Sequence, residues 1–84
     1  MEFDRGRVVL SRAGRDKGLF MAVAGAADGL ILVVDGDGRP IERPKRKNKR
    51  HLALTKTVLS EQAMATNRSL RRALTEFTDP EGDQ

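Results

Sequence analysis

The feature that most constrains the fold is a series of short apolar or β-branched segments separated by glycine-containing turns. These segments are residues 7–13, 19–24, 30–34 and 51–55, all within the first 55 of 84 residues. The run LILVV has three β-branched residues in five, which favours a strand over a helix. Four or five strands this short cannot form a flat open sheet without exposing its apolar face. We therefore expect a small, strongly bent β-barrel.

The connections between these segments carry the residues that turns require. Gly14 and Gly18 enclose the charged turn GRDKG, and each is expected to adopt a positive φ. GAADG, residues 25–29, is expected to form the next turn, and the DG pair at 37–38 is typical of a two-residue hairpin. PIERP, residues 40–44, has two prolines without N–H donors, so it is expected to be an edge strand or an extended connection.

The last third of the chain has a different pattern. Leu70, Leu74 and Phe77 recur at helical spacing. They predict a helix over 67–77, with Thr66 or Asn67 as its N-cap. The helix is expected to pack its apolar stripe on the barrel or on a protein partner. The predicted organisation is a barrel over residues 1–57, a C-terminal helical extension over 58–78 and a frayed tail over 79–84.

Composition excludes several classes of protein. A chain of 84 residues suits one small domain, and the absence of cysteine excludes a disulfide framework and cysteine-based zinc sites. No apolar run is long enough to span a bilayer, and the N-terminal residues lack the apolar region of a signal peptide. We therefore expect a cytoplasmic protein without a membrane partner.

The positive charge is concentrated in one part of the chain. The net charge is +4, but residues 1–51 carry +5 and residues 52–84 carry −1. The stretch RPKRKNKR, residues 43–50, has six positive charges in eight residues and no negative one. Such a block repels itself unless solvent or a polyanion relieves it, and bound phosphates release counterions. It is predicted to be a loop between two strands whose side chains face solvent, either as a phosphate contact or simply as a solvated loop.

GRVVLSRAGRDKGLFMAVAG resembles the KOW motif, in which a strand leads through a glycine-bounded basic turn into a second strand. The matching positions are Gly6, Val8, Leu10, Gly14, Lys17 and Gly18. The following segment, with its hairpin at 37–38, its proline-flanked basic run at 44–50 and its HL pair at 51–52, is similar to bacterial KOW-domain RNA-binding proteins related to archaeal and eukaryotic large-subunit ribosomal proteins. TNRSLRRALTEF resembles the C-terminal helix of that group, so the resemblance covers roughly residues 5–77.

This resemblance implies an SH3-like barrel that binds RNA, usually ribosomal RNA, as a ribosomal or ribosome-associated protein. It implies contacts from the glycine-bounded turn, with Gly6, Gly14 and Gly18 as the motif glycines. The basic residues of the turn and the block complete the predicted RNA-binding set: Arg12, Arg15, Lys17, Arg39, Arg43, Lys45, Arg46, Lys47, Lys49, Arg50 and His51.

Aromatic residues, which stack on bases, are scarce. The chain has no Trp or Tyr and three Phe. Phe20 and Phe77 are expected in the core, and Phe3 is expected to fray with the terminus or to stack on a base. Recognition is therefore expected to depend on the RNA backbone and shape, not on a linear motif.

Catalysis has little support in the sequence. His51 is the only histidine and lies in a basic run, and Asp35 and Asp37 flank a turn in which aspartate is structurally favoured. We expect no enzyme, no catalytic residue, no metal site and no cofactor. The remaining alternatives are a protein-interaction module, or a transcription-associated factor on an SH3-like barrel. Peptide grooves for proline-rich ligands need aromatic side chains that this chain lacks.

Overall fold

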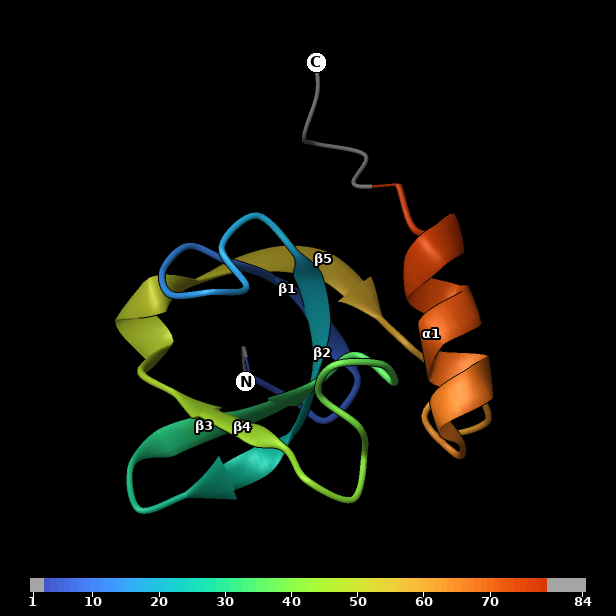
Figure 1. Cartoon of the computed structure of the whole chain (residues 1–84), viewed down its shortest axis with the longest axis horizontal. Coiled ribbons are helices and arrows are strands. Elements are labelled where there is room, and N and C mark those ends of the chain that lie inside the picture. The colour runs from blue at the N-terminus through green and yellow to red at the C-terminus, as the bar shows by residue number, and fades with distance from the viewer. Residues whose placement is uncertain (1–2, 79–84) are drawn as a thin grey trace.

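Each of the four segments predicted as strands forms one in the computed structural model, which describes residues 3–78. One antiparallel sheet has the order β4-β3-β2-β1-β5 and is followed by a single helix, which confirms the predicted mainly-β fold with a C-terminal helix. The sheet curls into a barrel-like form, with the helix beside β2 (Figure 1). The elements are β1 (Arg7–Ser11), β2 (Phe20–Ala27), β3 (Leu30–Val34), β4 (Lys45–Lys47), the 3-10 helix η1 (Lys49–His51), β5 (Leu52–Val58) and α1 (Asn67–Glu76).

The inside of the curled sheet holds the main apolar core. Successive side chains of a strand point to opposite faces. Met21 and Val23 of β2 therefore face inward, where they pack with buried residues of the other strands. This inner core consists of Val9, Met21, Val23, Ile31, Val33 and Leu52. Phe3 is partly buried and packs against this core, so the expectation that it frays with the terminus is wrong.

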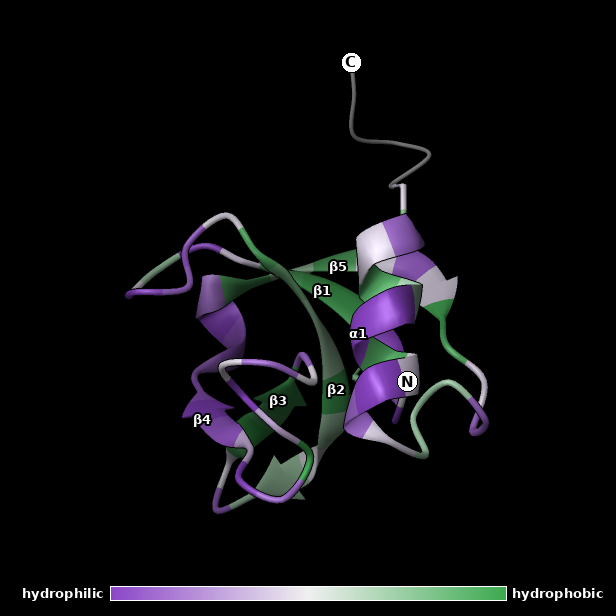
Figure 2. Ribbon diagram, turned by 45° about the vertical axis from the view of Figure 1, so that its right-hand side comes forward, coloured by the Kyte–Doolittle hydropathy of each residue, from purple (hydrophilic) through white to green (hydrophobic). Residues whose placement is uncertain are grey.

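The outer face of β2 carries small residues because the helical extension covers it. Ala22 is fully buried in a second cluster with Val34, Met64 and Leu70. Ala24 packs at the edge of that cluster. Figure 2 shows β4 in purple and β3 in green, while α1 carries purple, white and green bands. The helix therefore packs its apolar stripe on the sheet.

Helix α1 is fixed at its start by a capping box and by contacts with the loop before β4. The Thr66 side chain accepts from the Ser69 backbone N–H, which makes Thr66 the N-cap. Asn67 accepts from the Ile41 backbone N–H at 2.7 Å and donates to Glu42 at 2.9 Å. Gly36 packs so closely that an added Cβ would lie 2.9 Å from the Arg71 backbone nitrogen. Only a residue without a side chain fits there.

The aromatic pair at the end of the helix is half-buried and belongs to neither core cluster, so the expectation that Phe20 and Phe77 lie in the core is wrong. The rings of Phe20 and Phe77 meet edge to face with their centroids 5.0 Å apart. This contact ties the residue after α1 to the start of β2.

Two predictions about connections are wrong, and one of the two alternatives for a third is excluded. Residues 25–27 belong to β2, and the turn is formed by Asp28 and Gly29, both with positive φ. The DG pair at 37–38 does not join two strands, because residues 35–44 form a longer loop in which Asp35 accepts from the backbone N–H groups of Asp37 and Arg39. Residues 40–44 lie within this loop, so the edge-strand alternative is wrong and the segment is a connection. It turns rather than runs extended, with Arg43 N–H donating to the Pro40 carbonyl, and the edge strand begins at Lys45.

No helix within residues 3–78 is long and apolar enough to cross a membrane. The tail predicted over residues 79–84 lies outside the described residues.

Candidate nucleic-acid interface

The turn between β1 and β2 has the predicted glycine geometry. Gly14 and Gly18 have φ values of 83° and 89°, in the left-handed region that favours glycine. The backbone closes on itself, with Gly18 N–H donating to Ser11 and Leu19 N–H donating to Asp16. This geometry leaves the side chains of the turn's three cations exposed to solvent: Arg12, Arg15 and Lys17.

The turn's only carboxylate, that of Asp16, points inward. Its residue is 6% exposed, and its Oδ1 accepts from Ser11 Oγ at 3.0 Å and from Lys47 Nζ at 2.9 Å. Lys47 Nζ also donates to the Ala13 carbonyl at 2.7 Å. Because Lys47 belongs to β4, this buried ion pair fastens the turn onto the sheet edge. The turn therefore presents positive charge outward without an exposed carboxylate to offset it.

The ion pair sets the protonation of Asp16. Burial acts to raise the pKa of this carboxyl, but the hydrogen bonds from Lys47 and Ser11, together with the positive charge of Lys47, outweigh it and lower the pKa below its ordinary value. Asp16 Oδ2 is buried without a hydrogen bond, and Arg39 Nε lies 3.7 Å from it. Asp16 is thus an ionised anchor with two cations directed at it.

The basic block is not the loop that the sequence predicts. Its centre, KRK, forms β4 and pairs with β3, with Ile31 opposite Lys47, Leu32 opposite Arg46 and Val33 opposite Lys45. Directly opposed residues share a face of the sheet. Lys47 therefore points to the same side as buried Ile31, and Arg46 points to the other side.

This alternation corrects the expectation that all of the block's side chains face solvent. Lys47 is 7% exposed and bonded to Asp16 and Ala13, so it is not available as a phosphate contact. Lys45 is half-buried and Arg46 is exposed.

The 3-10 helix η1 displays the rest of the block. The Asn48 side chain accepts from the Arg50 backbone N–H at 3.1 Å and so caps η1. Lys49, Arg50 and His51 are all exposed on this single turn. The carbonyl of His51 accepts from the Arg12 backbone N–H at 2.9 Å. The beginning of the β1–β2 turn and the end of η1 are therefore hydrogen-bonded to each other.

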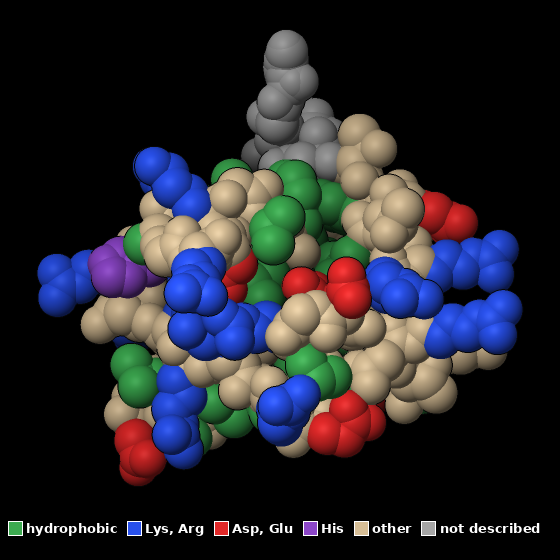
Figure 3. All heavy atoms as spheres, viewed as in Figure 1, with side chains coloured by type: hydrophobic (Ala, Val, Ile, Leu, Met, Phe, Trp, Pro, Cys, Tyr) green, Lys and Arg blue, Asp and Glu red, His purple; other side chains and the backbone are tan. Residues whose placement is uncertain are grey.

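Two contacts, the Asp16–Lys47 pair and the Arg12–His51 hydrogen bond, thus bring two basic segments side by side. Together they form what we call the basic surface: Arg12, Arg15, Lys17, Arg46, Lys49, Arg50 and His51, all exposed. Asp16 is the only acidic residue in either segment, and it is buried. Figure 3 shows Lys and Arg side chains gathered around the histidine on the left of the molecule, and a second basic group on the right over α1.

The other predicted site residues lie apart from this surface or support it. Arg39 is partly buried with its guanidinium directed at Asp16. Arg43 is exposed in the turn before β4 and follows Glu42, a carboxylate whose pKa is lowered mainly by the hydrogen bond from Asn67. Gly6 has a positive φ of 92° and bridges β2 to the end of β5 through its backbone, so its role is structural.

Sequence reasoning missed the anchor and the second basic group. Asp16 and Lys47 are 31 positions apart, and neither residue type signals burial. Arg68, Arg71 and Arg72 are exposed on α1, and the RSLRR pattern in the helix was the available signal for them. Among residues 3–78, no group of three or more metal-ligating side chains is placed to hold a metal ion.

Neither a protein-family model nor a curated protein sequence matches the chain.

Proposed function

We propose that this protein binds structured RNA through the phosphate backbone and that the basic surface is the contact. The supporting observation is that a buried Asp16–Lys47 pair holds two separate basic segments together with their six Lys and Arg side chains outward. Like charges held close together repel one another and destabilise the fold. A bound polyanion relieves this repulsion and releases counterions, which favours binding.

The choice of RNA over other polyanions rests on the resemblance of the turn, the basic block and the helix to KOW-domain proteins. By the same resemblance we propose ribosomal RNA as the target, in a ribosomal or ribosome-associated role in the cytoplasm. Phosphate contacts position a protein but do not specify a sequence. The basic surface offers no Phe, Tyr or Trp for base stacking, so we propose that shape and backbone carry recognition there.

We propose a binding role, not a catalytic one. His51 is exposed beside Arg50 on η1, in a position suited to contact phosphate. A protein partner for the apolar stripe of α1 is less favoured, because Leu70 is fully buried on the sheet.

The test is fluorescence anisotropy with a labelled RNA hairpin over a series of KCl concentrations. If about four to six side chains contact phosphates, the slope of log affinity against log salt is expected to be about −3 to −5. The double variant Lys49→Gln/Arg50→Gln should bind about tenfold more weakly or worse and lower the magnitude of the slope by about 2.

The matched control is Arg68→Gln/Arg72→Gln, which removes two exposed positive charges from α1 instead. It is expected to keep most of the affinity and the slope. Equal effects of the two double variants would refute the assignment to the basic surface. A DNA duplex of the same sequence that binds as tightly as the RNA would refute the preference for RNA.

A further inference from the structure

A hollow of about 320 Å³ opens between the β1–β2 turn, the loop after β3 and helix α1. Its apolar lining comes from Leu19, Phe20 and Leu74. Leu19 is 49% exposed, the largest exposed fraction among the large apolar residues within 3–78. An apolar surface of this kind in a small basic protein is a place where a flat apolar group gains by leaving water.

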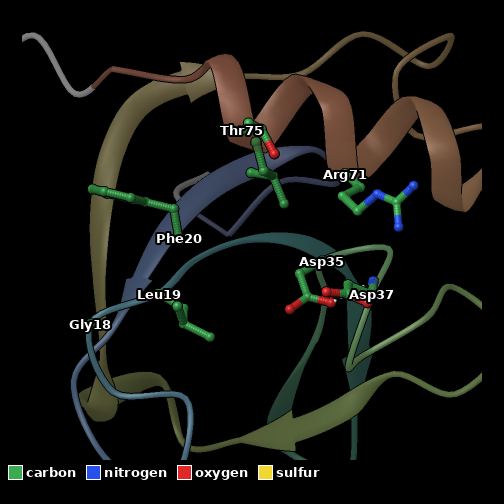
Figure 4. A pocket seen from close by; sticks show the side chains of 8 residues that line it. Gly18, Leu19, Phe20, Asp35, Asp37, Arg71 and Thr75 are labelled. Carbon is green, nitrogen blue, oxygen red and sulfur yellow. Dashed lines mark hydrogen bonds between the residues drawn. The ribbon is translucent and has the colours of Figure 1, made fainter.

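The polar lining of the hollow contains two carboxylates on one side and a guanidinium on the other. Figure 4 shows Arg71 and Thr75 on α1, Asp35 and Asp37 on the loop opposite, Leu19 just before β2 and Phe20 at its first position. Asp35 Oδ1 is already used, because it accepts from two backbone N–H groups of its own loop. The Asp37 carboxylate is exposed and makes no hydrogen bond or ion pair with the part of the chain that the structure describes.

We infer that this hollow takes one unpaired guanine base of the bound RNA, an inference that rests on the function proposed above. An ionised carboxylate only accepts hydrogen bonds, and its two oxygens bind a pair of parallel donors. Guanine alone among the four bases presents two adjacent donors on one edge, N1–H and the N2 amino group. Adenine and cytosine pair one amino donor with an acceptor that a carboxylate repels, and uracil has a single N–H between two carbonyls.

The rest of the hollow fits the same ligand. The base faces lie against Leu19 and Leu74 while the donor edge meets Asp37. Arg71 is then placed for the guanine O6 or for the nucleotide's phosphate, both of which are acceptors. Gly18 and Leu19 directly follow Lys17, so an RNA backbone on the basic surface has a short path to the hollow.

Charge disfavours the other class of occupant, a cationic peptide side chain. The hollow itself holds Arg71 beside the two carboxylates of Asp35 and Asp37, but the neighbouring turn carries three exposed cations. A peptide with a positive side chain would have to approach through that field. A nucleotide approaches with the opposite charge.

The test is NMR titration of the ¹⁵N-labelled protein with mononucleotides, which suits weak binding. GMP should shift the backbone amides of Leu19, Asp37 and Leu74, and AMP, CMP and UMP should bind at least about tenfold more weakly. IMP lacks only the N2 amino group and should bind about tenfold more weakly than GMP. Equal shifts with GMP and IMP, or shifts with N-acetyl-arginine-amide and not with GMP, would overturn the inference.

The variant Asp37→Asn should abolish the preference for GMP, because the amide replaces one acceptor by a donor. Asp28→Asn removes an exposed carboxylate from the β2–β3 turn and should leave the preference unchanged. Retention of the GMP preference by Asp37→Asn overturns the inference.

Hairpin RNAs with a single loop G or A separate this inference from the proposed function. Salt-dependent binding of both hairpins with equal affinity refutes the guanine site and leaves RNA binding standing. GMP-specific shifts in a protein that binds neither hairpin refute the RNA function and retain the hollow as a guanine nucleotide site.

Discussion

Replacing Lys47 by methionine should destabilise the protein severely, even though the residue lies in a block that reads as a solvated surface. Lys47 and Asp16 are 7% and 6% exposed, and Nζ lies 2.9 Å from Oδ1. Methionine fills similar space but leaves Asp16 buried without its main partner, a change that costs about 3–5 kcal/mol. An 84-residue domain has a free energy of unfolding of about 4–13 kcal/mol, so the loss is a large part of the total.

The stability lost by Lys47→Met should depend on pH, because it depends on whether Asp16 is ionised. In the native protein the pKa of Asp16 lies below its unfolded value, so its ionised form contributes stability above that value. This contribution is lost as the pH falls through the lowered folded pKa. In the variant, burial dominates and raises the pKa of Asp16. Protonation then relieves the cost, so the stability difference between the two proteins should begin to shrink as the pH falls through the raised pKa of the variant. It should shrink further below about 4, where the native protein loses its own contribution.

Urea unfolding followed by far-UV circular dichroism measures both effects, since the chain has no Trp or Tyr for fluorescence. Lys49→Met makes the same change at an exposed neighbour and should cost little. The double variant Asp16→Asn/Lys47→Met removes the buried charge and should recover part of the loss. A cost below about 1 kcal/mol for Lys47→Met, or a loss that is equal at pH 7 and pH 3, would refute the anchor.

Three further predictions concern the fold. Gly14→Val and Gly18→Val should each cost at least about 1–2 kcal/mol by thermal unfolding, because both positions have a positive φ that a β-branched residue adopts only with strain. Variants that melt at the temperature of the parent would contradict the turn geometry. Gly36→Ala should displace α1 and weaken amide-exchange protection in the helix, and unchanged protection would show that the contact yields freely. Leu70→Ala should cost about 2–5 kcal/mol in urea unfolding, and a near-neutral result would mean that α1 does not share the core.

The strands and the helix could be predicted because each carries its own local pattern. LILVV is β-branched, and Leu70, Leu74 and Phe77 have helical spacing. β4 has no such pattern, because a run of lysine and arginine becomes a strand only by pairing with the free edge of β3. Because side chains alternate along a strand, the pairing of β4 determines that Lys47 points inward. A sequence reading that did not predict this strand could not predict the buried Asp16–Lys47 pair.

The sequence predicted most of the residues of the candidate site, but not how the fold brings the two basic segments together. The exposed cations of the turn and of η1 followed from charge and from turn chemistry. That the two segments meet depends on Asp16, a turn carboxylate whose burial is set by a residue on the far edge of the sheet. The hollow could not be predicted, because its lining joins a turn, a loop and a helix only after the helix packs on β2.

The position of β1 in the middle of the sheet has a consequence for the order of folding. Val9 pairs with Met21 on one side and with Leu54 on the other. The first pairing needs only a short hairpin, whereas the second closes a long loop and is intrinsically slow. Of the two contacts that join the basic segments, the Arg12–His51 hydrogen bond continues that same β1–β5 pairing beyond Ser11 and Leu52, whereas Lys47 reaches Asp16 from β4, which pairs with β3. A chain whose last strand has not yet docked therefore lacks the Arg12–His51 contact, and its two basic segments are joined only through the Asp16–Lys47 pair.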